Sequence, residues 1–346
     1  MNLTDFEDDI MEDFSDIGSP GYLPTISMTE LYNTVYRNKP AIIEGLLYPG
    51  TYLFVGAPKQ GKSFLMLQMA YHISTGKALW GYAVRQGTVL YLALEDDHGR
   101  LQSRLYRMFG TEAAENLFLS VWSKQVGTGL DEQIEQFVRK HSDTVLVIID
   151  TLQKVRATGS DRYSYASDYE NISTLKALAT KLDIGLLLVH HTRKQQADDK
   201  FDMISGTNGL LGAADGAFIL EKERRTAKTA TLEIAGRDQQ EQRLHLQQDL
   251  TTLQWVLEKA ETELWQEPPE PLLQMVRGLL SEDHPLWEGS PTGLAQALHL
   301  DMKPNQLSTK LNVNARRLLQ EQNISYHNSR THAGRKITLR LIDSKA

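Results

Sequence analysis

The chain has 346 residues, of which 41% are hydrophobic and 23% are charged, enough for one large or two ordinary domains with hydrophobic cores. Because it contains no cysteine, disulfides, thiolate catalysis and cysteine-based zinc sites are excluded. Its longest apolar runs are far shorter than the ~20 residues that span a bilayer, and it opens with acidic residues rather than a signal peptide. We therefore expect a cytoplasmic protein with no membrane contact.

The negative charge is concentrated at the N-terminus. The formal net charge of −7 at first argues against a nucleic-acid partner. Residues 1–18, however, contain seven acids and no base; subtracting these seven from the 44 acids of the chain leaves 37, equal to the number of lysines and arginines. From Lys303 to the end, nine bases face only two acids. The sequence thus predicts an acidic tail, a neutral central part and a basic C-terminal segment.

Apolar patterning divides the chain into four predicted parts. They are an acidic flexible tail (1–22), a large α/β domain (23–264), a proline-bearing linker (265–271) and a small domain (272–346). In the large domain, alternating strands and helices favour a mostly parallel sheet covered on both faces. The predicted strands are 51–55, 87–94, 117–122, 144–149, 184–189, 215–221 and 229–235, and the predicted helices are about 62–75, 97–109, 130–140 and 168–182. We expect the last two strands to form a hairpin at the edge of the sheet.

The small domain is predicted to begin with helices and end with a hairpin. Its helices are predicted at Leu272–Leu280, Thr292–Leu298 and Pro304–Glu321, and its strands at Ile324–His327 and Lys336–Leu341. This order is the plan of a winged helix, in which 304–321 would be the recognition helix.

The strongest motif is G-x-x-x-x-G-K-S, which follows an apolar strand and opens a helix, the context that a phosphate-binding loop requires. In such a loop, backbone N–H groups and the helix N-terminus hold phosphates, the lysine neutralises their charge, and the serine ligates Mg²⁺. A chance glycine-rich turn is the alternative. We predict binding of ATP and Mg²⁺, with Lys62 catalytic and Ser63 a metal ligand. The predicted ATP-binding residues are Gly56, Ala57, Pro58, Lys59, Gln60, Gly61, Lys62, Ser63 and Phe64.

Two further buried strands end in acidic residues. Asp150 follows Val145–Ile149 and is predicted as the second acid on the Mg²⁺ side, although it could instead cap the next segment. Glu95 follows strand 87–94, at the carboxyl edge where open α/β sheets place their active sites. We predict Glu95 as the base that orients the attacking water, whereas Asp96 or Asp97 could simply cap the following helix.

A histidine pair, His190 and His191, ends the predicted strand 184–189. At the carboxyl edge of a sheet that binds ATP, one of the two is a candidate sensor of the γ-phosphate. A zinc site is a poorer alternative, because adjacent strand residues point to opposite faces and no further ligands cluster here.

In combination, the segments GAPKQGKS, LALEDD, LVIID, LLLVHHTRK, SGTNGLLGAADGAFIL and IAGRD resemble the RecA-like ATPases of the plasmid RepA helicase type, relatives of DnaB and RecA. The resemblance covers about Lys39 to Leu257 and implies a RecA-like core. It assigns Glu95 as the catalytic glutamate and Asp150 as the Mg²⁺-side acid. It also selects His190, three residues before Arg193, as the sensor.

The resemblance further implies that Arg237 is an arginine finger that enters the ATP site of a neighbouring subunit. A finger supplied by a neighbour requires an oligomer, here expected to be a homo-hexamer. The alternative for Arg237 is an ordinary surface ion pair with Asp238.

Predicted DNA contacts lie in two places. The stretches 158–168 and 193–208 fit the family's channel loops, where Arg193, Lys194 and Lys200 would follow single-stranded DNA, although ordinary solvated loops look similar. The basic C-terminal domain is predicted to hold DNA phosphates, with protein or the acidic tail as alternative partners. The residues predicted for this role are Lys310, Arg316, Arg317 and Lys336.

The function that the sequence favours is an ATP-dependent DNA helicase or translocase for replication of a plasmid, phage or mobile element. The alternatives are a RecA-like recombination or repair ATPase and a DNA-binding regulator that uses ATP as a switch without unwinding DNA. A small-molecule kinase fits least, because a kinase can act as a monomer and does not require Arg237 from a neighbour.

Overall fold

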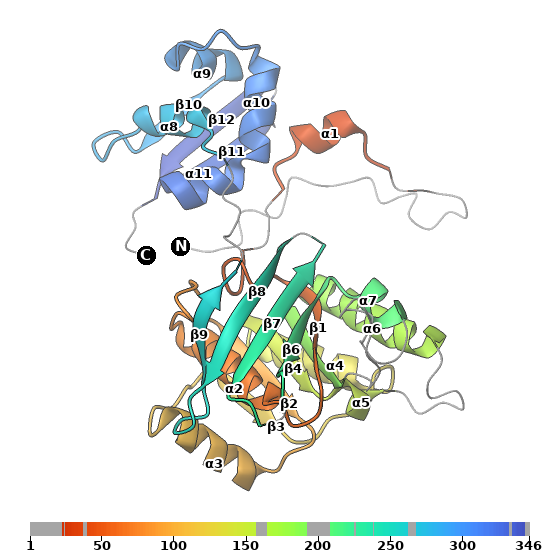
Figure 1. Ribbon diagram of the computed structural model, residues 1–346. Helices are drawn as coiled ribbons and strands as arrows, with labels where there is room; N and C mark the ends of the chain where they lie inside the picture. Colours follow the sequence, from red (N-terminus) through yellow and green to blue (C-terminus); the bar gives the residue numbers. More distant parts are fainter. Residues whose placement is uncertain are drawn as a thin grey trace. The chain divides into compact units, whose positions relative to one another are not determined.

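The computed structural model describes residues 23, 25–36, 40–156, 165–191, 208–224, 226–237, 239–261, 268–331 and 334–342 (Figure 1). The chain divides into two units, one of residues 39–266 and one of residues 1–38 with 267–346. Within the described part of the chain, none of the helices is long and apolar enough to cross a membrane.

The large unit is an α/β structure whose elements follow the predicted alternation. Its helices are α2 (Lys62–Thr75), α3 (His98–Phe109), α4 (Leu130–Lys140), α5 (Leu152–Val155), α6 (Tyr165–Leu182) and α7 (Asn208–Ala213). Its strands are β1 (Gly50–Gly56), β2 (Thr88–Ala93), β3 (Leu117–Ser120), β4 (Thr144–Asp150), β5 (Gly185–His191), β6 (Gly216–Glu221), β7 (Thr229–Gly236), β8 (Gln239–Gln248) and β9 (Trp255–Ala260).

The strands form one nine-stranded sheet in the order β3-β2-β4-β5-β1-β6-β7-β8-β9. The strands from β3 to β6 pair in parallel, and β7, β8 and β9 continue the sheet in antiparallel pairs. The predicted mostly parallel sheet is confirmed. The predicted β6–β7 hairpin also forms, but β8 and β9 lie beyond it, so it is not at the sheet edge. In β8, the buried Gln242, Leu244 and Leu246 alternate with more exposed polar residues. The sequence pattern does not predict this strand, because most of its residues are polar.

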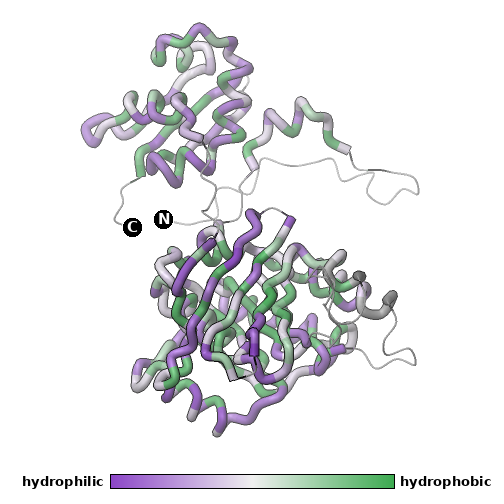
Figure 2. Tube along the Cα trace, viewed as in Figure 1, coloured by the Kyte–Doolittle hydropathy of each residue, from purple (hydrophilic) through white to green (hydrophobic). Residues whose placement is uncertain are grey.

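The sheet separates two hydrophobic cores because successive strand residues face opposite sides. Along β1, Tyr52 and Phe54 enter the core beneath α2 and α3, whereas Leu53 and Val55 enter the core covered by α4, α5, α6 and α7. Figure 2 shows the resulting concentration of apolar residues in the central strands. Strands β7 to β9 add Leu232, Leu246 and Trp255 to the α2 side, so the antiparallel strands help to enclose α2.

The small unit contains α8 (Pro271–Gly278), β10 (Leu286–Gly289), α9 (Pro291–Ala297), α10 (Pro304–Val313), α11 (Ala315–Gln322), β11 (Ile324–Thr331) and β12 (Gly334–Leu341). Its antiparallel sheet has the order β10-β12-β11. This is a winged-helix-like arrangement, as predicted, with β10 as an additional strand. The predicted helix 304–321 is two helices, because the chain leaves helical geometry at Asn314.

The N-terminal segment belongs with the small unit, whereas the predicted domain boundaries place residues 23–38 in the large domain. Helix α1 (Met28–Asn33) starts at a capping box in which Ser27 and Glu30 exchange hydrogen bonds. It contacts α10, where the Asn312 side-chain amide donates to the Tyr32 carbonyl oxygen at 2.8 Å. Val35 packs against the hydrophobic core of the small unit. These long-range contacts are not visible in the local sequence pattern.

Candidate active site

The predicted motifs meet at the carboxyl edge of the parallel strands in the large unit. In the strand register, Gly56 at the end of β1 lies opposite His191 of β5. Asp150 at the end of β4 lies opposite Val189 of β5 and Ala93 of β2. Parallel pairing therefore brings the phosphate loop, the two acidic strand ends and the histidine pair together, as expected for an open α/β sheet.

The loop between β1 and α2 is shaped to let backbone approach a ligand. A side chain at Gly56 would place its Cβ 2.6 Å from the Leu220 carbonyl oxygen. Gly61 has φ +92°, and its Cβ would lie 3.0 Å from the Trp255 ring. The N-cap residue of α2 is Gly61, which has no side chain that could cap the first N–H groups. The first N–H groups of this helix are therefore available to phosphate oxygens, so the loop fits the phosphates of a nucleotide.

Lys62 lies inside this loop, with only 5% of its surface exposed. Its Nζ donates to the carbonyl oxygens of Gly56 at 2.6 Å and Ala57 at 3.0 Å. Burial lowers the pKa of Lys62 from 10.5 to about 8, although the nearby charges of Asp150 and Glu95 act in the opposite direction. The ammonium group is held by weak neutral acceptors, so phosphate oxygens would be stronger partners for it.

Asp150 forms a compact polar cluster with Ser63 and Tyr91. The Tyr91 hydroxyl donates to Asp150 Oδ2 at 2.7 Å, and the Ser63 side chain is hydrogen-bonded to the same carboxyl group. Burial raises the pKa of Asp150, whereas these hydrogen bonds and the Lys62 charge lower it. A serine hydroxyl beside a carboxylate is an oxygen donor set suited to Mg²⁺. Tyr91 belongs to no sequence motif, because it lies within the apolar run of β2 and carries no signal of its own.

The three consecutive acids after β2 have separate environments. Asp97 caps α3, its Oδ1 accepting from the Arg100 backbone N–H at 2.9 Å. Asp96 forms ion pairs with Arg100 and Arg104. Glu95 Oε1 accepts a hydrogen bond from the Thr151 hydroxyl at 3.1 Å, and within the described residues its carboxylate makes no ion pair.

Glu95 is thus the acid of the three whose carboxylate faces the loop and Asp150. Its charge raises the pKa of both Lys62 and His191 and so acts on the same cluster. Its side chain is exposed, which leaves room for a water molecule beside it.

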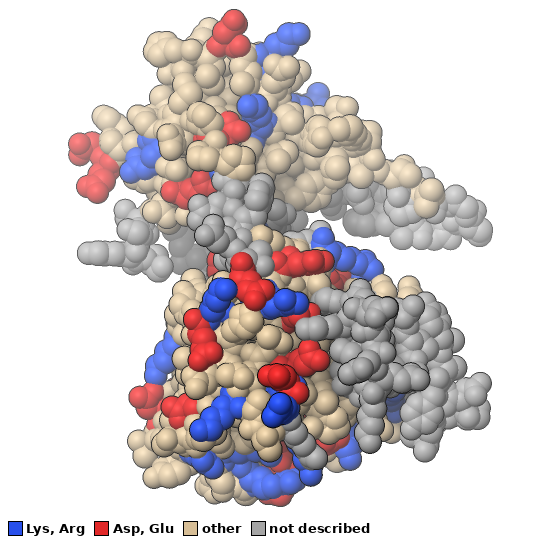
Figure 3. Space-filling view, viewed as in Figure 1, with Lys and Arg blue, Asp and Glu red and all other residues tan. Residues whose placement is uncertain are grey.

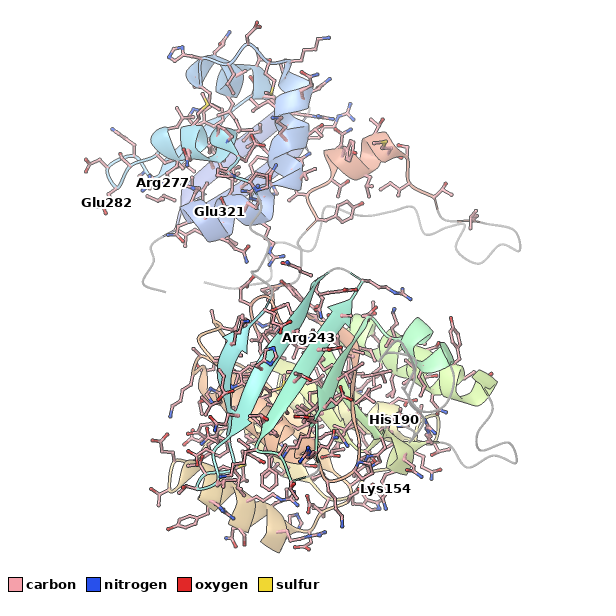
Figure 4. The ribbon with its side chains drawn as sticks, viewed as in Figure 1. Lys154, His190, Arg243, Arg277, Glu282 and Glu321 are labelled. Carbon is pink, nitrogen blue, oxygen red and sulfur yellow. The ribbon has the colours of Figure 1, made fainter. Side chains whose placement is uncertain are left out.

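The two histidines of β5 point to opposite faces of the sheet. His191 follows Val189 on the α2 side, and its Nδ1 lies 3.1 Å from Lys62 Nζ. Burial and the Lys62 charge lower the pKa of His191, so its neutral ring can accept from the ammonium group through Nδ1. His190, labelled in Figure 4, is 5% exposed and follows Leu188 on the face of α4 to α7.

The structure therefore places His191, and not the predicted sensor His190, against the phosphate loop. The side-chain period of two in a strand puts the two rings on opposite faces, and the packing of α2 decides which face holds the loop.

Arg237 lies at the turn between β7 and β8, far from the phosphate loop of its own chain. Gly236 is opposite Gly216, which is opposite Tyr52 near the start of β1. The Arg237 side chain is exposed, and its Nη2 donates to the Gly212 carbonyl oxygen at 2.8 Å. Its backbone N–H donates to the Asp215 carbonyl oxygen at 2.9 Å, which anchors the turn.

Trp255 supports the phosphate loop, although no sequence motif indicates it. Its ring is 1% exposed and packs beneath Gly61, with Nε1 3.3 Å from the Gly61 carbonyl oxygen. Its backbone exchanges two hydrogen bonds with the Gln68 side chain of α2, at 2.7 and 2.8 Å. Lys222 Nζ lies 4.9 Å from the ring centre, in the geometry of a cation–π contact.

Of the predicted DNA-contacting bases, Arg193, Lys194 and Lys200 lie outside the described residues, as do most of both predicted channel loops. The four in the small unit are already engaged. Lys310 pairs with Glu270 at 3.7 Å, Arg317 with Glu321 at 2.6 Å and Lys336 with Glu288 at 2.9 Å, and Arg316 donates to the Gln320 amide oxygen at 3.0 Å. Figure 3 likewise shows charges of both signs interspersed on the visible face of each unit.

A nine-stranded sheet, a phosphate loop at the end of β1 and acids at the ends of β2 and β4 define a RecA-like P-loop ATPase. A family model described as an AAA domain matches residues 23–197, half of the chain. The chain belongs to this family.

Solved structures share the fold. The chain is similar to the "ATPase Domain of G40P" at 18% identity and a TM-score of 0.53, covering 63% of this chain and 92% of that one. It is also similar to a DnaB-like replicative helicase, described with its interactions with primase, at 17% identity and a TM-score of 0.51. That match covers 64% of this chain and 62% of the helicase, less than two thirds of its length. A comparison with curated proteins finds no match.

Proposed function

We propose that the protein is an ATP-dependent DNA helicase or translocase of the RepA type, acting in replication of a plasmid, phage or mobile element. It would hydrolyse ATP at the interfaces of a homo-oligomer, expected to be a hexamer. The observation that carries the proposal is the position of Arg237 relative to the phosphate loop.

The strand register places Arg237 away from the ATP site of its own chain. Its turn lies beside Tyr52, whereas the phosphate loop begins at Gly56, four residues further along β1. At about 3.3 Å per residue, the turn of Arg237 and the phosphate loop are about 13 Å apart along the strand direction. They lie at opposite ends of the parallel strands. In a ring of identical subunits packed head to tail, we expect the end of the sheet that carries Arg237 to face the end that carries the phosphate loop in the next subunit. Arg237 would then reach the neighbour's site.

Each residue of the candidate site has a proposed role in ATP hydrolysis. Lys62 and the N–H groups of the loop would bind the β- and γ-phosphates, and Glu95 would orient a water molecule for attack on the γ-phosphorus. Mg²⁺ held by Ser63 and Asp150 would neutralise charge on the phosphate oxygens. Arg237 of the neighbour would stabilise the charge that develops in the transition state.

His191 would report the state of the site. Its ring contacts Lys62, which would bind the γ-phosphate, and His191 is the last residue of β5. The chain that follows β5 includes the predicted channel residues Arg193, Lys194 and Lys200. A shift of this histidine on loss of the γ-phosphate would therefore act directly on a segment proposed to hold single-stranded DNA.

A mixing experiment tests the shared site. Lys62→Ala and Arg237→Ala subunits are each expected to lack ATPase activity as pure proteins. In mixed rings, about one interface in four would combine an intact Lys62 with an intact Arg237, so activity should partly return. Mixing either variant with itself at the same concentration is the control. No gain on mixing would mean that each chain hydrolyses ATP alone, or that Arg237 plays no part.

The DNA role is tested by measuring ATP turnover with and without single-stranded DNA, together with strand displacement on a forked duplex. Stimulation with displacement supports the helicase. Stimulation without displacement would leave a translocase, a recombination or repair ATPase, or a regulator. ATP turnover that DNA does not change would contradict the proposed function.

A further inference from the structure

The small unit contains a polar cavity beside the turn end of its β11–β12 hairpin. The cavity has a volume of about 450 Å³ and lies between the starts of α9 and α10 and this hairpin. Its polar lining consists of Ser290, Thr292, Asn305, Arg330 and Arg335. None of the described residues that line it is acidic. None of its printed lining residues belongs to the phosphate loop.

Two arginines face each other across this hairpin. Arg330 of β11 and Arg335 of β12 are directly paired in the strand register. They stand in the same alternating series as the buried Tyr326 and Ile337, so both lie on the same face of the hairpin as these core residues, nearer the turn. Arg330 is exposed and Arg335 is half-buried. Like charges placed directly opposite each other on a sheet are destabilising. A bound anion would remove that cost.

Arg335 has a buried group for which the described residues offer no hydrogen-bond partner. Its Nη1 is buried and makes no hydrogen bond within the described part of the chain. The charge of Arg335 also acts on the buried Tyr326 hydroxyl, where it opposes the rise in pKa that burial causes. The guanidinium group is therefore turned into the unit rather than out to solvent. An unsatisfied buried donor is costly and calls for a partner.

The two cavity arginines differ from three of the four bases that were predicted to hold DNA phosphates in this unit. Lys310, Arg317 and Lys336 each have a carboxylate partner. Within the described residues, neither Arg330 nor Arg335 has one. A nucleic acid that approached the paired bases would have to displace their acids, whereas the two hairpin arginines offer their charge without competition.

We propose that this cavity binds a backbone phosphate of nucleic acid, held between the guanidinium groups of Arg330 and Arg335. The inference rests on the proposed DNA-dependent function and specifies where the small unit contacts the strand. Two guanidinium forks match phosphate oxygens, and Asn305 and the hydroxyl of Ser290 add uncharged donors. The Ser290 hydroxyl accepts from the Gly293 N–H at 3.1 Å and so keeps its own proton to donate.

The test uses the full chain and labelled oligonucleotides of mixed sequence, single-stranded and duplex, with fluorescence anisotropy at several salt concentrations. Arg330→Gln and Arg335→Gln are each expected to weaken binding about tenfold, because a hydrogen-bonded charge is lost. The slope of log affinity against log salt should fall by about one. Arg340→Gln is the matched control, because it removes the same charge from β12. Arg340 is exposed and lies on the opposite face of this strand from Arg335, so DNA affinity should change about twofold or less.

Three outcomes would overturn the proposal. In the first, both hairpin variants bind DNA as the wild type does, with an unchanged salt slope. In the second, inorganic phosphate stabilises the wild type against heat through Arg335 while DNA affinity is independent of Arg335, which would make the cavity a site for a small anion. In the third, Arg335→Gln lowers the unfolding temperature, since loss of one of two opposed like charges should leave it unchanged or raise it.

The same assay separates this proposal from the proposed function. If the wild type binds neither oligonucleotide, the DNA-dependent function itself fails. If the wild type binds and its ATP turnover responds to DNA while the hairpin variants behave identically, only the assignment of the cavity fails.

Discussion

Replacing Lys62 by methionine removes a buried charge from the phosphate loop while keeping the length of the side chain. Because burial lowers the pKa of Lys62 from 10.5 to about 8, its charged form destabilises the folded protein at pH 7 by up to about 3 kcal/mol. Loss of its hydrogen bonds to the Gly56 and Ala57 carbonyl oxygens offsets about 1 kcal/mol of the gain. Without nucleotide, Lys62→Met should therefore be more stable than the wild type by about 2 kcal/mol, or about 6 °C.

The pH dependence of this stability difference tests whether the buried charge of Lys62 causes it. Between pH 8 and 10.5 the unfolded chain keeps the Lys62 proton while the folded chain has lost it, so this group makes the wild type more stable as pH rises. The variant lacks this group. Its advantage should shrink by about 1 kcal/mol, or about 3 °C, between pH 7 and pH 9.

Thermal unfolding followed by circular dichroism at both pH values measures these differences. Lys59→Met is the matched control, because Lys59 belongs to the same loop but is exposed, and its replacement should change stability by about 0.5 kcal/mol or less. ATP with Mg²⁺ should stabilise the wild type and not Lys62→Met. A variant that is no more stable than the wild type at pH 7, or whose advantage is the same at pH 9, would refute the reasoning.

Three further predictions concern neighbouring residues. Glu95→Gln should keep the thermal stabilisation by ATP but lose about 10²-fold or more in phosphate release, and near-normal turnover would exclude Glu95 as the base. His191→Gln should reduce the DNA stimulation of ATPase activity more than His190→Gln does, because only His191 contacts Lys62; equal effects would contradict this assignment. In urea unfolding, Trp255→Ala should cost about 3–5 kcal/mol and the 64% exposed Trp122→Ala about 0.5 kcal/mol or less, whereas similar costs would show that Trp255 does not support the loop.

Sequence patterns predicted the parts of the site whose chemistry is local. The phosphate loop is a contiguous strand, turn and helix, and its glycines, Lys62 and Ser63 are recognisable without any knowledge of the rest of the chain. The apolar runs that end in Glu95 and Asp150 predict buried strands, and parallel pairing then requires their carboxyl ends to share one edge. Those positions agree with the structure.

Long-range contacts account for what was missed. The Gln68 side chain and the Trp255 backbone, which hold α2 against β9, are 187 residues apart in the chain. Strand β8 is recognisable afterwards from the inward Gln242, Leu244 and Leu246, but its polar partners resemble a loop until β7 is seen to pair with it. The number of bases in the C-terminal segment follows from the sequence, but this number does not show which bases have acidic partners.

The sequence by itself determined that the chain has a RecA-like ATPase core with a phosphate loop, and a small winged-helix-like unit rich in basic residues. Only the tertiary structure decided which histidine meets Lys62, because strand periodicity puts His190 and His191 on opposite faces, while the packing of α2 selects the face. It also decided where Arg237 lies relative to the loop, since that depends on the strand order. Finally, it decided which of the described bases of the small unit have acidic partners, because an ion pair is set by distance in space rather than along the chain.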